Sequence, residues 1–218
     1  MELYQKITLY SHIASGGFTL LSGLAPMITK KGSTIHRRAG MVYFYTMVGV
    51  VVTAAAICLP RIHEYKMQFL LTIAVFSFYM AYTGRRVLQL RTGEYQLIDK
   101  VVLGAILLCT IAMFLLQNFI LAIFGILLLR LCYVDMKIYL YWDELKRKEH
   151  SEFIMKSHIG KMIGAYIATI TAFILNNFHF DSVPYYVPWF SPALIFIPFI
   201  IYWSRKYDKK QSTHETTI

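Results

Sequence analysis

Seven long apolar runs dominate this sequence, and clusters of polar or charged residues separate most of them. A helix needs about 20 mostly apolar residues to cross a hydrocarbon core about 30 Å thick. Only helices and closed barrels can cross, because backbone groups find no water to bond there. The runs are continuous rather than alternating, which favours helices over barrel strands. The sequence therefore predicts an all-α, polytopic membrane protein.

The seven predicted spans cover most of the chain, and only the fourth and fifth follow one another closely. Gln117 and Asn118 alone separate these two, which predicts a tight hairpin. We expect one transmembrane domain over 1–205 and a polar cytoplasmic tail over 206–218 that is disordered. The predicted spans are 7–28, 40–59, 67–83, 101–116, 119–141, 159–175 and 187–203.

Most of the 22 Lys and Arg residues lie after the first, third and fifth spans or in the tail. Cytoplasmic loops carry an excess of these residues, so the pattern predicts an outside N-terminus and a cytoplasmic C-terminus. We expect the bacterial inner membrane as the location and the lipid bilayer as the main partner. The formal net charge of +10 is divided among short connections rather than gathered on one solvated face, which disfavours nucleic acid as a partner.

Two ionisable residues lie in the fifth predicted span, with Arg130 near its middle and Asp135 closer to its cytoplasmic end. A charge at such a depth costs about 2.5–3.5 kcal/mol and is a candidate for function. Arg130 and Asp135 are about 140° apart around a helix, so Arg130 should find its partner on another helix. Two interpretations stay open, a buried arginine that fixes helix packing and a clamp for a propionate, carboxylate or phosphate.

Histidines are predicted near both membrane faces, with His12 and His63 on the outer side and His36 and His158 on the cytoplasmic side. One b-type haem near each face, held between paired imidazoles, would use this layout, and Arg130 could then face a propionate. The alternative for each histidine is a bond to lipid head groups or loop carbonyls at the interface.

A second set of possible ligands lies at the cytoplasmic boundary. His36, Asp135 and His158 would meet there if the second, fifth and sixth spans are neighbours. Two imidazoles and a carboxylate are compatible with a divalent metal ion. The sequence thus offers a haem b or a divalent metal as cofactor.

Small residues follow His12 at helical spacing in the first predicted span. They are Ser15, Gly16, Thr19 and Gly23, and together they predict a helix face without bulk. Such a face permits either close packing of another helix or room for a flat ligand beside the imidazole.

Three stretches of this chain resemble bacterial multi-pass membrane proteins of the family called domain of unknown function number twenty-three hundred and six, or a close variant of it. The resemblance rests on His12 with its following glycines, on the set His36, Arg37, Arg38 and Gly40, and on His158 with Met162. Lys161 stands before Met162, where the family often has Trp or Arg. The resemblance covers most of the spans, implies that the three histidines matter, and brings no activity.

Motifs for nucleotide binding, zinc hydrolysis and serine hydrolysis are absent from the sequence. Our main hypothesis is an inner-membrane protein that binds haem or metal through its histidines and works in redox chemistry. The alternative is a transporter or permease-like protein whose polar path includes Arg130 and Asp135. A third hypothesis is a structural or assembly partner of other membrane proteins.

Overall fold

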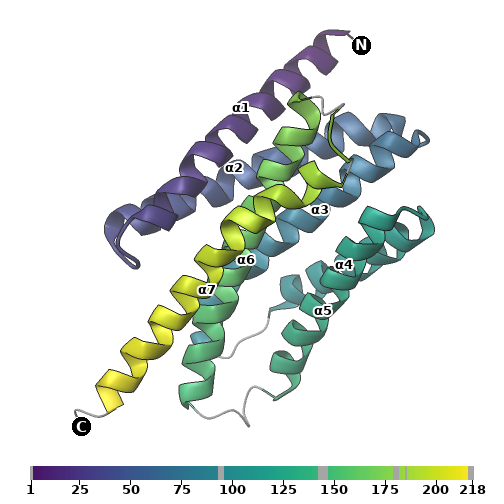
Figure 1. The fold of residues 1–218 in the computed structure, drawn as a ribbon. Helices are drawn as coiled ribbons and strands as arrows, with labels where there is room; N and C mark the ends of the chain where they lie inside the picture. Colours follow the sequence, from purple (N-terminus) through teal and green to yellow (C-terminus); the bar gives the residue numbers. More distant parts are fainter. Residues whose placement is uncertain (1, 93–95, 142–146, 179–181, 185, 216–218) are drawn as a thin grey trace. The chain divides into compact units, whose positions relative to one another are not determined.

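The computed structural model is helical, and its described part comprises residues 2–92, 96–141, 147–178, 182–184 and 186–215, in which no β-strand occurs (Figure 1). The prediction of an all-α chain is therefore confirmed for these residues. The helices are α1 (Glu2–Ile28), α2 (Thr34–Cys58), η1 (Leu59–Arg61), α3 (Tyr65–Arg86), η2 (Val87–Thr92), α4 (Leu97–Leu115), α5 (Phe119–Tyr141), α6 (Arg147–Asn177) and α7 (Val187–Glu215).

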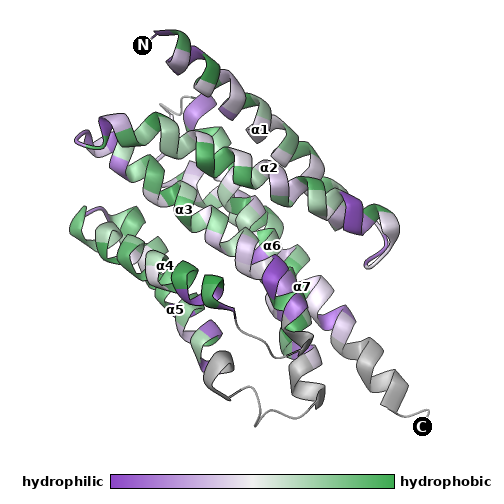
Figure 2. Ribbon diagram, turned by 180° about the vertical axis from the view of Figure 1, so that it is seen from behind, coloured by the Kyte–Doolittle hydropathy of each residue, from purple (hydrophilic) through white to green (hydrophobic). Residues whose placement is uncertain are grey.

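Six stretches in the described part are long and apolar enough to cross a membrane, one in each helix from α2 to α7. Helix α1 is not among them, although its 27 residues would extend about 40 Å. Ser, Thr, Gly and His residues lower its hydropathy, and Figure 2 shows α1 in mixed colours where α4 and α5 are mostly green. A seventh span and the orientation of the termini stay predictions.

The helices of the chain group into two compact units. The first unit contains Met1–Tyr79 and Gln96–Lys137, and the second contains Met80–Tyr95 and Ile138–Ile218. Sequence neighbours form the main contacts within each unit, because α1 packs along α2 and α6 packs along α7. Short connections favour such antiparallel helix pairs.

All the described α-helices except α5 extend beyond their predicted spans, and α2, α6 and α7 do so most. Helix α2 begins at Thr34, where Ser33 Oγ accepts a hydrogen bond of 3.2 Å from the backbone N–H of His36. Helix α6 begins at Arg147, and α7 continues to Glu215 through most of the tail for which we predict disorder. Hydropathy locates the apolar part of a helix, whereas these helices continue into polar residues on the solvated side.

The turn between α4 and α5 is the tight hairpin predicted from Gln117 and Asn118. Gln117 has a φ of 50°, a left-handed conformation that reverses the chain. Asn118 Oδ1 then accepts the backbone N–H groups of Ile120 at 2.9 Å and Leu121 at 3.2 Å. Its side chain therefore caps the first turn of α5, as the side chains of N-cap residues do.

We expect Asn118→Ala to lower the free energy of unfolding by about 1 kcal/mol, because both N–H groups lose their acceptor. Thermal unfolding of the purified chain in detergent measures the effect. Asn176→Ala is the matched control, since Asn176 only donates to the Ala172 carbonyl of its own helix. Equal midpoints for the two variants would show that the cap contributes nothing.

The small face predicted on α1 packs against α2. Thr19 and Gly23 are buried, and a Cβ placed on Gly49 of α2 would lie 2.8 Å from Ser15 Oγ. The two helices therefore approach each other at small residues, which is how helices associate closely in membranes. Of the two uses that the sequence leaves open, the structure shows close packing.

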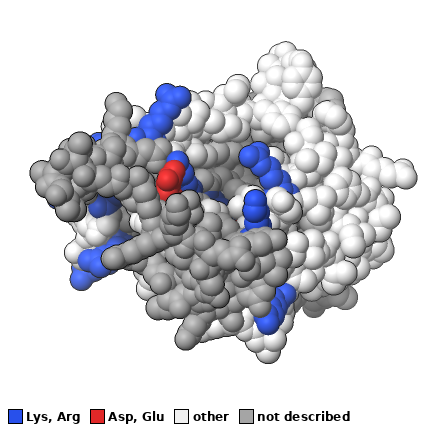
Figure 3. All heavy atoms as spheres, turned by 90° about the horizontal axis from the view of Figure 1, so that it is seen from below, with Lys and Arg blue, Asp and Glu red and all other residues white. Residues whose placement is uncertain are grey.

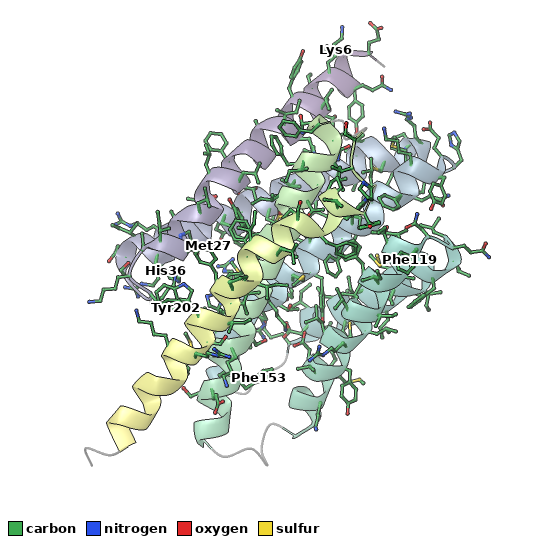
Figure 4. All side chains as sticks on the ribbon, viewed as in Figure 1. Lys6, Met27, His36, Phe119, Phe153 and Tyr202 are labelled. Atoms are coloured by element: carbon green, nitrogen blue, oxygen red, sulfur yellow. The ribbon has the colours of Figure 1, made fainter. Side chains whose placement is uncertain are left out.

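In the second unit, α6 is held by neighbours on both sides. Val87 of η2 and Ile154 of α6 are buried together, with Phe153 packed against them (Figure 4). Tyr166 of α6 meets Phe196 of α7 edge to face, with ring centroids 5.3 Å apart. These contacts hold α6 against η2 and α7.

Candidate ligand-binding histidines

His158 is anchored where α6 meets the end of α3. Its ring Nδ1 lies 2.7 Å from the backbone carbonyl oxygen of Gly84, and its side chain is half-buried. A carbonyl oxygen can only accept, so Nδ1 carries the proton and donates it. In the neutral ring, Nε2 then bears the lone pair.

Gly84 permits this contact because nothing but a hydrogen fits on its Cα. A Cβ built there would lie 2.9 Å from Lys161 Cβ and 3.1 Å from Met162 Sδ. The backbone of α3 thus approaches α6 closely, and the Gly84 carbonyl comes within reach of the imidazole. His158 and Met162, two residues of the third stretch that carries the family resemblance, both contact this glycine.

Lys161 is the residue at this contact that our sequence reasoning missed. Its side chain is only 4% exposed, in the apolar part of α6 and three residues after His158. An ionisable residue inside a span is a candidate for function by default. The sequence does contain a signal for this residue, because Lys161 is a charged residue inside the predicted span 159–175.

His36 is held in a similar way at the corner between α1 and α2. Its Nδ1 lies 3.1 Å from the carbonyl oxygen of Pro26, and Figure 4 shows His36 and Met27 together at this corner. Nδ1 must again be the donor. His36 therefore presents the same tautomer as His158.

His12 of α1 is half-buried against α2, where its Nδ1 lies 2.9 Å from Thr53 Oγ1. The Thr53 hydroxyl itself donates to the Gly49 carbonyl at 2.6 Å. Its single proton is thus directed away from the ring, and Nδ1 is again assigned as the donor. All three histidines of the family resemblance share this tautomer.

His63 differs from these three. It lies in the turn between η1 and α3, where its side chain is exposed and forms no hydrogen bond with the described residues. His12 bonds to Thr53 rather than contacting His63. The outer pair of imidazoles proposed from the sequence therefore has one anchored member and one unanchored member.

The three predicted metal ligands each have a separate partner. His36 bonds to Pro26 and His158 to Gly84, while Asp135 Oδ2 accepts a hydrogen bond of 2.8 Å from Tyr79 Oη. No group of three or more His, Cys, Asp or Glu side chains suited to a metal ion occurs among the described residues. His36 and Asp135 belong to the first unit and His158 to the second, so the predicted set stays a prediction.

Arg130 lies on the exposed face of α5, whereas we expect from the sequence that its side chain is buried between helices. The buried positions of this helix include Leu121, Gly125, Leu128 and Cys132, which share one face. Arg130 is two residues from Leu128, about 200° around the helix, and its side chain is exposed. It forms no hydrogen bond or ion pair with the described residues, so the interhelical partner predicted for it is not found there.

No family model, no curated protein and no solved structure matches this chain. The resemblance noted in the sequence therefore stays a prediction. The fold and the three anchored histidines define a helical chain with six potential membrane spans and imidazoles set at helix contacts.

Proposed function

We propose that this chain is a seven-span protein of the bacterial inner membrane that holds a haem b or a divalent metal ion through its histidines. In this proposal the N-terminus lies outside and the C-terminus in the cytoplasm. The excess of Lys and Arg after the first, third and fifth predicted spans supports this orientation. Lys and Arg also outnumber Asp and Glu among the described charged side chains visible in Figure 3.

One observation carries the cofactor proposal, namely the hydrogen bond that each of His12, His36 and His158 makes through Nδ1 to an oxygen of the chain. Histidines that bind metals almost always donate their other ring N–H to a carbonyl, carboxylate or water. This bond fixes the ring orientation, and Nε2 is the ring nitrogen that would bind the metal in this proposal. A bound haem or metal would supply the redox chemistry.

The residues of the chain then have separate roles. The Gly84 carbonyl orients the His158 ring, and Thr53 orients His12. Both imidazoles are half-buried, and the exposure of such a site to water affects the reduction potential of a bound cofactor. Electron transfer would need only this rigid placement.

Optical spectra of the purified protein, oxidised and reduced, together with metal analysis, test the proposal. We expect a haem Soret band or a stoichiometric metal, and we expect His12→Ala and His158→Ala each to change the spectrum or the metal content. His63→Ala is the matched control, because that side chain is exposed. A preparation with neither a Soret band nor bound metal would refute this function.

The alternative function, a transporter or permease-like protein, has one observation in its favour. Tyr79 is only 2% exposed and donates its hydroxyl to Asp135, so a polar pair lies within apolar helices. Ionisable groups of this kind line proton and ion paths in membrane proteins. The exposed position of Arg130 weakens the part of the path that we assign to it.

A further inference from the structure

The corner between α1 and α2 gathers basic residues without any acidic counterpart. Lys30, Lys31, Arg37 and Arg38 lie within nine positions of one another, and no Asp or Glu occurs between Glu2 and Glu64. The side chains of Lys30, Arg37 and Arg38 are exposed. These three exposed cations are called the basic corner below.

The backbone beneath the basic corner is held in place by its own hydrogen bonds. Lys31 Nζ donates to the carbonyl oxygens of Pro26 at 2.5 Å and Met27 at 2.8 Å, which caps the C-terminal end of α1. His36 Nδ1 donates to the same Pro26 carbonyl at 3.1 Å. Gly32, with a φ of 76°, makes the turn that joins the two helices.

Two groups of this corner thus bond to the chain, while the three cations of the basic corner project from it. None of Lys30, Arg37 and Arg38 forms an ion pair within the described part of the chain. The basic corner lies at the end of a helix, α2, that is apolar enough to cross a membrane. Lys and Arg side chains that cluster at the end of a membrane span are close to the lipid phosphates, and anionic head groups attract them.

We propose that the basic corner binds the head group of an anionic phospholipid, with the phosphate between the side chains of Arg37, Arg38 and Lys30. A guanidinium offers a fork of N–H donors that matches two phosphate oxygens, and the neighbouring cations add attraction. The anchored turn lowers the entropy cost of binding, because the backbone is already ordered. This inference requires the membrane location but is independent of any haem or metal.

The opposite end of the same helix provides a comparison. Arg61 donates to Glu64 through Nε at 2.7 Å and through a second nitrogen at 2.8 Å. This hydrogen bonding lowers the pKa of the Glu64 carboxyl below its ordinary value, so the pair stays charged at neutral pH. The Arg61 charge is thus balanced within the chain, and that end should show no preference for anionic lipid.

Native mass spectrometry of the full chain, with added phosphatidylglycerol or phosphatidylcholine, tests the proposal. We expect more bound phosphatidylglycerol, and we expect Arg37→Gln with Arg38→Gln to reduce the preference by about tenfold or more. The variant with Lys at both positions keeps the charges and should keep most of the preference. Raising the salt concentration should weaken it, because the attraction is between exposed charges.

Arg61→Gln with Lys66→Gln is the matched control, since it removes two charges beyond the opposite end of α2, one in η1 and one at the start of α3. We expect this control to retain the lipid preference of the unaltered chain. Equal losses in the two double variants, or no loss in either, would overturn the proposal. Displacement of phosphatidylglycerol by millimolar inorganic phosphate would also overturn it, because the site would then be one for free phosphate. Unchanged thermal midpoints show that the variants are folded.

Discussion

Gly84→Leu is expected to lower the free energy of unfolding by about 3 kcal/mol, the largest effect that we predict for any single substitution in this chain. A Cβ at Gly84 would lie 2.9 Å from Lys161 Cβ, and the remaining leucine carbons have no room. Because Lys161 Cβ is fixed to its backbone, relief requires α3 and α6 to separate. Thermal unfolding in detergent, followed by the loss of monodisperse protein, measures the change.

Gly104→Leu is the control for this substitution. Gly104 lies on an exposed part of α4, and a Cβ there meets nothing within 4 Å. A leucine at that position also improves helix propensity, so we expect the midpoint to stay the same or to rise. If Gly84→Leu were as stable as Gly104→Leu, the close approach of α3 and α6 at Gly84 would be wrong.

The same substitution also tests the histidine proposal. Separation of α3 from α6 removes the Gly84 carbonyl from His158 Nδ1 and frees the ring to rotate. If His158 binds a haem or metal, Gly84→Leu should alter the spectrum or the metal content of the protein that remains folded. The group that accepts the other ring N–H of a metal-binding histidine typically contributes about 10-fold to 100-fold to metal affinity.

Tyr79→Phe is expected to lower the free energy of unfolding by about 1–2 kcal/mol. The hydroxyl donates to Asp135 Oδ2 at 2.8 Å in a position where Tyr79 is 2% exposed. Hydrogen bonds between membrane helices average about 0.6 kcal/mol with a maximum near 1.7, and an acceptor that can carry charge favours the upper part of that range. Tyr133→Phe is the control, because Tyr133 lies exposed on α5.

A double-mutant cycle separates the bond from the packing of the ring. Replacing both partners, as in Tyr79→Phe with Asp135→Leu, leaves neither a buried donor nor a buried acceptor. We therefore expect the double variant to lose less stability than the sum of the two single variants. Additivity to within about 0.5 kcal/mol would mean that the two side chains do not interact.

Hydropathy and turn chemistry predict much of the fold from sequence. The bounds predicted for α5 agree with the structure, and the hairpin at Gln117 and Asn118 is confirmed. Apolar runs report the membrane-embedded length of a helix directly. They do not report where a helix continues into polar residues. For this reason α2 and α6 begin earlier in the sequence than the predicted spans do.

The orientation of side chains around each helix was much harder to predict. Apart from Arg130, Asp135 and Lys137, helix α5 is apolar around its circumference, so its sequence contains little periodic signal for the face that packs inward. Arg130 was therefore placed in the interior, although it lies opposite Leu128. Lys161 is the opposite case, a charged residue whose side chain is buried. It lies where α6 approaches Gly84 of α3 closely. Such outcomes depend on contacts between helices that a single sequence does not encode locally.

The polar character of α1 has a consequence for how the protein is made. Three of its hydroxyl groups donate within the helix, as when Thr8 donates to the Tyr4 carbonyl and Thr19 to the Ser15 carbonyl. Its small face is covered by α2. Helix α1 is not among the candidate membrane spans, whereas α2 is one of them. We expect the two to enter the bilayer as a preassembled hairpin, with α1 held at the translocon until α2 has been synthesised.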